Sequence, residues 1–331
     1  MRKEPQALIC KGSRIMLFQD FSAIVICKVN VVTIYVLLYK DCGLSPCVRR
    51  YLGAMAAADL LVIIFDLILR HIPIVYRDQF YFLRVSVSVC NIHAILLYAA
   101  TDCSVWFTVT FTFDRFVAIC CQKLKSKYCS EKAAAVVLGA VTVLSCLKNI
   151  FWYFMLTARY RLENTPWFCG ATDTVVLSSV WVTIEFLHHI LTPCVPFLLI
   201  LLLNVLTVRH ILVTSRARRR LRAHTNGDAQ TDTEMRNRKK SIILLFVISA
   251  NFILLWSTLM LYSIWRRMDY FGYRSVYLHL FVRELGFMLQ LLSCCTNTAI
   301  YAVTQSKFRQ QLKNVLKYPF TQIHPSIKFS H

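Results

Sequence analysis

Asp114, Arg115 and Phe116 form a consecutive acid–base–aromatic triplet near the end of a long apolar run, Ile92–Cys121. An arginine stays protonated in a protein, so its side chain has to pair with an acid or reach water. Charged side chains in or beside a membrane-length apolar segment are costly and usually mark a functional site. The triplet therefore predicts an ion pair that can be made and broken at one end of a helix, which is the chemistry of a switch.

A second acid, Asp59, lies in the middle of the apolar run Tyr51–Leu69. An unpaired charge at the centre of a membrane helix costs about 2.5–3.5 kcal/mol on insertion scales. Asp59 therefore needs polar neighbours from other helices. A structural polar cluster without a bound ion would meet this requirement.

Seven apolar runs are long enough to position these residues across a membrane. The chain has 331 residues, of which 57% are apolar and 17% charged, against about 45–50% and about 25% in an ordinary soluble domain. A bilayer core requires roughly 20 apolar residues of helix. The runs are Phe21–Tyr39, Tyr51–Leu69, Ile92–Cys121, Ala133–Leu156, Val175–Val208, Ser241–Ile264 and Tyr277–Val303. We predict an all-α membrane protein, a seven-transmembrane helix bundle spanning residues 21–305, and not a soluble enzyme.

The formal net charge of +21 is concentrated in the loops between the runs and in the tail. This distribution follows the positive-inside rule better than it fits a nucleic-acid partner. It places residues 1–20 outside the cell as a short N-terminus without a visible signal peptide, and residues 306–331 in the cytoplasm. We expect a multi-pass protein of the plasma membrane that contacts lipid.

Two cytoplasmic segments have distinctive patterns. Residues 214–240 are polar and strongly basic, and we predict that they form a third intracellular loop, with helix continuing through Ser215–Arg222 and resuming at Arg236–Lys240. The basic residues fit either a docked protein partner or anionic lipid. Ser306–Leu316 has apolar residues at helical spacing with cations between them, which predicts a short amphipathic helix on the inner membrane face.

Most of the 14 cysteines fall inside apolar runs or inner loops, where we expect reduced thiols that act as small hydrophobic side chains. Cys90 and Cys169 differ because both lie on the outer side, next to polar loop sequence. We predict a disulfide between these two residues, tying an outer loop to the start of the third helix.

An ordered set of residues, roughly one group per run, resembles the rhodopsin-like G-protein-coupled receptors. The set consists of Asn30, Ala56-Ala57-Ala58-Asp59-Leu60-Leu61, Cys90 with Asp114-Arg115-Phe116, Pro196, Phe252-x-x-x-Trp256 and Asn297-x-x-x-Tyr301. The resemblance covers nearly the whole chain. Within the family, the overall sequence pattern and His188-His189 look similar to the orphan branch that contains G-protein-coupled receptor 139. That branch is associated with sensing aromatic amino acids.

The resemblance implies roles for individual residues. It implies that Asp59 is surrounded by Asn30, Ser104, Ser293 and Asn297 as a hydrated site for an allosteric sodium ion. It implies a switch facing a heterotrimeric G protein, made of Asp114, Arg115, Phe116, Asn297 and Tyr301. It also implies that Phe252, Trp256 and Pro196 transmit a change of packing from the outer half of the bundle to that switch.

Several positions depart from the family pattern. Phe116 stands where tyrosine is more usual, and threonines stand where prolines follow Trp256 and Asn297 (Thr258 and Thr298). Many members also hold the arginine with an acid on the sixth helix, and counting back from Trp256 places Arg238 there. Because like charges repel, we expect a loosened resting state with some basal activity.

Polar residues in the outer halves of the runs are the candidates for binding a ligand, which we expect to be a small molecule such as an aromatic amino acid or a peptide. Asp66 and Arg70 are spaced to pair on one helical face. A zwitterion needs a cation, an anion and an aromatic slot. The candidates are Asp66, Arg70, Tyr98, Asp102, Glu185, His188, His189, Trp256, Glu284 and Gln290, with Arg283 beside them. The two histidines also fit zinc, although without an open catalytic setting.

Two other classes of protein remain as alternatives. A transporter or channel predicts internal repeats and paired broken helices, and the chain has neither pattern. A non-signalling decoy or chaperone of receptor ancestry is favoured by the two missing prolines.

Overall fold

The computed structural model describes residues 24–75, 87–150, 152–153, 160–162, 169–171, 179–222, 230–270 and 280–323. Among these residues, five helices are long and apolar enough to cross a membrane: Pro46–His71, Ser88–Cys120, Phe186–Arg216, Ile242–Trp265 and Phe281–Thr304. A sixth span is counted if the bent pair Gln122–Tyr128 and Glu131–Asn149 is one unit, and the shorter apolar helix Ile24–Tyr39 is the first of the series. The predicted fold class is confirmed.

The helices after Ile24–Tyr39 follow the predicted order. The second span consists of α2 (Pro46–Val62), the π-helix η1 (Ile63–His71) and α3 (Ile72–Val75). The third is α5 (Val87–Cys120), followed by the short α6 (Gln122–Tyr128) and by α7 (Glu131–Asn149). An antiparallel pair, β1 (Tyr160–Leu162) and β2 (Cys169–Ala171), precedes α10 (Ser179–Arg222), α11 (Gln230–Tyr270), α12 (Leu280–Thr304) and α13 (Ser306–Ile323).

Two helices, α2 and α7, begin at serine caps near the inner end of the bundle. Ser45 caps α2 by accepting a hydrogen bond from the Val48 N–H at 3.4 Å, and Pro46 occupies the first turn, where no N–H is needed. Ser130 caps α7 in the same way through the Ala133 N–H at 3.2 Å. Between the first helix and α2, Gly43 adopts a left-handed φ of 65°, which glycine tolerates without strain. The Gly43 N–H hydrogen bond and the Lys307 ammonium lower the pKa of Asp41 below its usual value.

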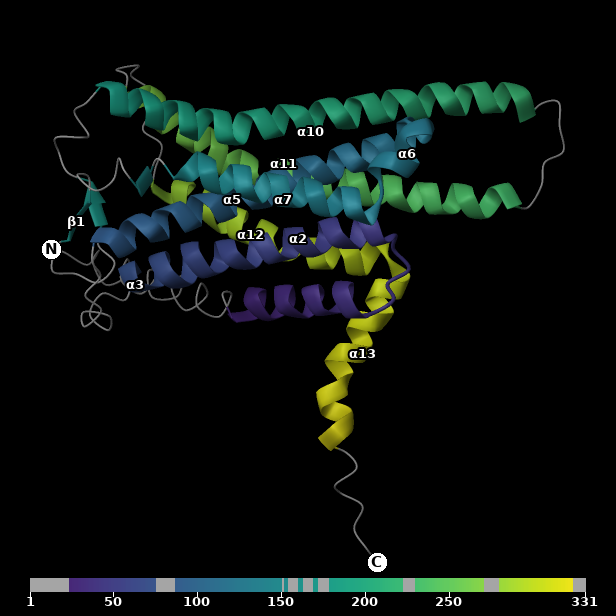
Figure 1. Cartoon of the computed structure of the whole chain (residues 1–331), viewed down its shortest axis with the longest axis horizontal. Helices are drawn as coiled ribbons and strands as arrows, with labels where there is room; N and C mark the ends of the chain where they lie inside the picture. Colours follow the sequence, from purple (N-terminus) through teal and green to yellow (C-terminus); the bar gives the residue numbers. More distant parts are fainter. Residues whose placement is uncertain are drawn as a thin grey trace, which may run out of the picture.

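The long helices lie side by side along the longest axis of the molecule, and α13 turns away from the bundle at one end (Figure 1). The strand β1 lies at the opposite end, so α6 and α13 mark the end predicted to be cytoplasmic. The largest core cluster joins the first helix, α2, α5, α7, α11, α12 and α13, with Leu52, Phe111, Tyr301 and Phe308 fully buried in it. The inner half of the bundle is therefore one continuous core.

One predicted boundary around the basic loop agrees with the structure, and two other predicted boundaries differ in extent. α10 runs to Arg222, as predicted, and α11 begins at Gln230 rather than at Arg236, while residues 223–229 lie outside the described residues. Arginine, lysine and glutamine are good helix formers, which explains how both helices extend past the apolar runs. The amphipathic helix begins at Ser306 as predicted but continues to Ile323. Phe308 faces the core while Lys307, Arg309 and Lys313 are exposed.

Candidate functional site

Asp114 and Arg115 form an ion pair at the inner end of α5, as the sequence predicts. The Arg115 Nε donates to Asp114 Oδ2 at 2.9 Å, and the two residues are 8% and 4% exposed. The guanidinium also lies over the Phe111 ring, 5.9 Å from its centre. All three residues lie on α5. Phe116 is only partly buried, and the side chain of Arg238 lies outside the described residues.

Two cysteines that the sequence did not single out also contact Asp114. The Cys47 thiol, at the start of α2, donates to Asp114 Oδ1 at 3.2 Å. The Cys129 thiol, between α6 and α7, donates to the Asp114 carbonyl oxygen at 3.5 Å. Burial and the nearby Asp114 carboxylate raise the pKa of Cys129 to about 11, so this thiol is protonated at neutral pH. Asp114 is therefore held by four donor contacts from three separate segments of the chain.

The buried carboxylate of Asp59 connects α2, α5 and α12. Ser104 donates to Asp59 Oδ1 at 2.6 Å, and the Asn297 amide donates to Asp59 Oδ2 at 2.9 Å. The structure thus brings these three predicted neighbours together. Ser293 instead accepts a hydrogen bond from the Trp256 indole at 3.0 Å and donates to the carbonyl oxygen of Gln290 at 2.6 Å.

Asn30 lies beside this cluster and bonds to backbone. Its amide donates to the carbonyl oxygens of Cys294 at 2.9 Å and Ile26 at 3.1 Å, and its own side-chain oxygen is buried without a partner among the described residues. Asn30 leaves one buried oxygen unpaired, and Asp59, Ser104 and Asn297 supply carboxylate, hydroxyl and amide oxygens, the kind of ligand that hard cations take. Asp59, Ser104, Ser293 and Asn297 would hold such an ion.

The predicted transmission residues pack against one another near the Asp59 cluster. The rings of Phe252 and Trp256 on α11 lie 5.4 Å apart, in a cluster with Ile200 of α10, and Pro196 is buried one turn before it. Thr258 does not interrupt the helix, since α11 is continuous from Gln230 to Tyr270.

Thr298 uses its hydroxyl between helices rather than within its own. It lies 2.6 Å from the Thr33 hydroxyl of the first helix, and Thr33 itself donates to the carbonyl oxygen of Val29. Thr298 is therefore the donor, because the Thr33 proton is already used. The residue that stands in place of the family's proline thus ties α12 to the first helix.

Tyr301 is fully buried, and its ring packs edge-on against Phe308 of α13, 5.9 Å between centres. Its hydroxyl has no hydrogen-bond partner among the described residues. An unsatisfied buried hydroxyl costs about 1–3 kcal/mol, which favours a second packing in which the group is bonded.

The outer candidates fall into separate groups. Asp66 and Arg70 form the predicted ion pair within η1, with Arg70 over the Phe287 ring. Arg283 and Glu284 pair at the start of α12, where both are exposed, and Gln290 is buried. Cys90 is buried and disulfide-bonded at the outer end of α5. The side chains of Cys169, Glu185 and His189 lie outside the described residues.

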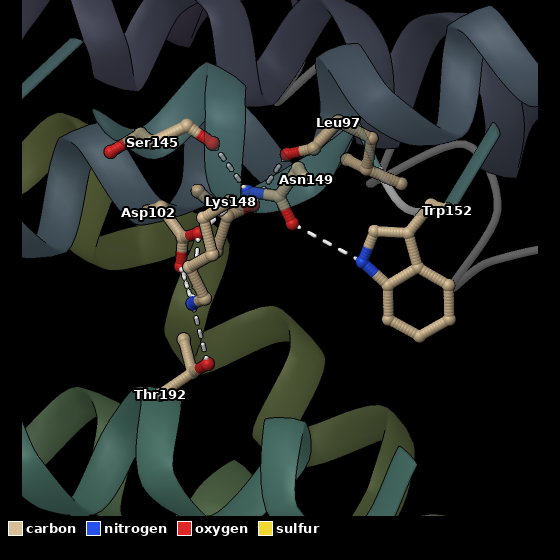
Figure 2. A network of polar contacts seen from close by, with 8 residues as sticks. Leu97, Asp102, Ser145, Lys148, Asn149, Trp152 and Thr192 are labelled. Atoms are coloured by element: carbon tan, nitrogen blue, oxygen red, sulfur yellow. Dashed lines mark hydrogen bonds and ion pairs between the residues drawn. The ribbon is translucent and has the colours of Figure 1, made fainter. Parts of the chain in front are cut away.

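Asp102 has partners that the sequence did not predict (Figure 2). The Lys148 ammonium on α7 contacts both of its carboxylate oxygens, at 3.2 and 3.0 Å, and also the Thr192 hydroxyl of α10 at 3.0 Å. Asn149 donates to Asp102 Oδ2 at 2.7 Å. A usable signal existed, because Lys148 is the sole charged residue in the run Ala133–Leu156.

Comparison with protein families shows which family the chain belongs to. The model described as 7 transmembrane receptor (rhodopsin family) matches residues 29–301, which is most of the chain. The chain belongs to the rhodopsin family of seven-transmembrane receptors. It is therefore a multi-pass signalling receptor of a family that is not enzymatic and that generally responds to extracellular ligands and couples to G proteins.

Proposed function

We propose that this receptor binds a small extracellular ligand in the outer half of its bundle and activates a heterotrimeric G protein through Asp114 and Arg115. It resides in the plasma membrane with its N-terminus outside, and a Cys90–Cys169 disulfide fixes the outer loop. The observation that carries the proposal is the buried Asp114–Arg115 pair at the inner end of α5. Ionisable residues in membrane segments are rare and costly, so a buried charged pair there points to a functional site.

The geometry supports a two-state switch with Arg115 as the moving part. Its pair with Asp114 and its contact with Phe111 hold it inside the bundle in this packing. In the second packing Arg115 leaves Asp114 and becomes the contact for the G protein, while the orphaned Tyr301 hydroxyl gains a partner. A ligand that binds the second packing more tightly shifts the equilibrium toward it.

A sodium ion at Asp59 would favour the resting packing. The carboxylate already accepts from Ser104 and Asn297, and the Trp256 indole reaches the same region through Ser293. Trp256 and Phe252 would then relay a change at the ligand site to these residues. The ligand class that fits the outer candidates is an aromatic amino acid or a small peptide, in keeping with the resemblance to the branch of G-protein-coupled receptor 139.

The test is a screen of amino acids and small peptides for G-protein activation in cells that express the full chain. We expect a ligand-dependent response that Arg115→Ala abolishes and Lys28→Ala leaves intact, because Lys28 is exposed on the first helix, away from the cytoplasmic end. Uptake of a compound without G-protein activation would indicate a transporter. Surface expression with no response to any compound, and no basal signal above cells lacking the chain, would support a decoy instead.

A further inference from the structure

Three segments of the chain (α5, α10, and α7 with the residues just after it) each place one polar and one aromatic side chain, four residues apart, in the same part of the bundle. Residues four apart lie on one helical face, one turn above the other. The pairs are Tyr98 with Asp102 on α5, Trp152 with Lys148 beside α7, and His188 with Thr192 on α10. Because α7 runs opposite to α5 and α10, the aromatic member lies on the β1 side in every pair. The result is an outer aromatic layer above an inner polar layer.

The polar layer is fully bonded. The Lys148 ammonium has three N–H groups and three acceptor atoms within reach, two on Asp102 and one on Thr192. The Asn149 amide donates to Asp102 and to the Ser145 carbonyl oxygen, and its oxygen accepts from the Trp152 indole at 3.2 Å. A buried polar network with every member satisfied fixes the positions of the helices that carry it.

The aromatic layer is packed directly onto this network. Tyr98 and Trp152 are stacked with ring centres 4.8 Å apart and planes 17° apart, and His188 stands edge-on to both, at 5.4 and 5.1 Å. The Trp152 indole N–H joins the two layers through Asn149 (Figure 2). A shift of Asp102 or Lys148 would therefore move the aromatic rings.

The two charges are buried unequally. The Asp102 side chain is 2% exposed, whereas the Lys148 side chain is 40% exposed. A lysine with part of its stem outside the protein interior can carry its ammonium toward water or lipid headgroups if its partner is lost. A carboxylate that is almost completely enclosed has no such route. Replacing Lys148 should therefore lower the stability of the receptor more than removing the charge of Asp102.

We propose that Asp102 and Lys148 form an intramembrane clasp that positions the layer of Tyr98, Trp152 and His188 as the wall of the ligand site. Asp102 is then a positioning residue and not the counter-ion of a ligand amine, since its carboxylate is occupied by Lys148 and Asn149. The ligand that fits this wall has a flat aromatic or apolar group, and a basic amine is not required here. The role of the aromatic layer as the wall of a ligand site rests on the proposed function, whereas the Asp102–Lys148 clasp does not.

The clasp is tested on the full-length receptor in detergent with Lys148→Met, Asp102→Asn and the double variant. We expect Lys148→Met to lower the melting temperature on the order of 10 °C, because it leaves a buried charge without its partner. Asp102→Asn should lower it by less than half as much, and the double variant should recover most of the loss of Lys148→Met. Purely additive shifts, or a larger effect of Asp102→Asn, would overturn the clasp.

A second measurement separates positioning from general stability. The difference in fluorescence between the receptor and its Trp152→Phe variant isolates the Trp152 signal at a temperature where all variants are folded. We expect a shifted Trp152 emission in Asp102→Asn and a signal close to that of the native receptor in Lys148→Arg, which keeps the charge. An unchanged emission in Asp102→Asn would refute the positioning role. Neither measurement uses a ligand or a G protein, so failure of the proposed function would show separately, as absent signalling.

Discussion

Replacing Cys47 tests whether a thiol holds the switch in its resting packing. Cys47 is 1% exposed, and its thiol donates to the oxygen of Asp114 that faces away from the Arg115 Nε bond. A hydrogen bond contributes about 1 kcal/mol to the state that contains it. Since 1.4 kcal/mol corresponds to about tenfold in an equilibrium constant, Cys47→Ala should raise the active fraction about fivefold at low occupancy. Cys47→Ser supplies a stronger hydrogen-bond donor to Asp114 and should lower the active fraction.

The assay is agonist-independent nucleotide exchange on purified G protein, with membranes matched for receptor content by an epitope tag. Cys42→Ala is the matched control, because Cys42 is also a buried thiol but bonds to the carbonyl oxygens of Val36 and Lys40 rather than to Asp114. We expect basal activity to be lowest in Cys47→Ser, intermediate in the native receptor and highest in Cys47→Ala. Cys42→Ala should have the native basal activity. A basal rate in Cys47→Ala equal to the native one, or a raised rate in Cys47→Ser, would refute the reasoning.

Other positions give independent tests. Asp59→Leu leaves the Ser104 hydroxyl and the Asn297 amide without an acceptor, which costs about 1–3 kcal/mol for each donor. The melting temperature of Asp59→Leu should therefore be well below that of Asp59→Asn. Replacing choline by sodium at constant ionic strength should raise the melting temperature of the native receptor and not of Asp59→Asn; no sodium effect would remove the ion from the proposal. Gly286→Ala places a methyl group 2.9 Å from the Leu259 Cα and should cost about 1–3 kcal/mol, whereas Gly139→Ala meets nothing within 4 Å and should stabilise its helix by up to about 1 kcal/mol. Equal shifts in melting temperature for the two glycine variants would contradict this packing. Because burial raises the pKa of Cys129 to about 11, its alkylation rate should keep rising from about pH 7 to about pH 10, measured by mass spectrometry of the labelled peptide; a plateau below about pH 9 would contradict it.

Sequence patterns predicted the features that depend on one helix at a time. Apolar runs gave the membrane helices, and a spacing of four gave the Asp66–Arg70 ion pair, because both follow from helix geometry alone. The contacts of Asp59 with Ser104 and Asn297 were also expected, although from resemblance to a family rather than from spacing. Nothing in the spacing of residues so far apart in the chain indicates that they meet.

The sequence did not predict those contacts between helices that the family resemblance does not imply. Lys148 meets Asp102 across 46 residues, and Cys47 meets Asp114 across 67. Lys148 stands out as the sole charged residue of its apolar run, but nothing in the sequence indicates its partner, and a cysteine in an inner loop has an ordinary explanation as a small hydrophobic side chain. The start of α11 was also placed too late, at Arg236 rather than Gln230, because hydropathy marks where a helix leaves the membrane and not where it ends.

The two buried acids place α5 at the centre of the receptor's polar organisation. Asp102 and Ser104 are two residues apart on α5, about 200° around the helix, so they face nearly opposite directions at almost the same depth. Ser104 binds the Asp59 cluster of α2 and α12, while Asp102 binds Lys148 of α7 and, through it, Thr192 of α10. A rotation of α5 that favoured one network would break the other, so α5 is held from both sides. Movement during activation is therefore expected in α11, which contacts α12 through the Trp256–Ser293 bond, while α5 serves as the fixed support of Arg115.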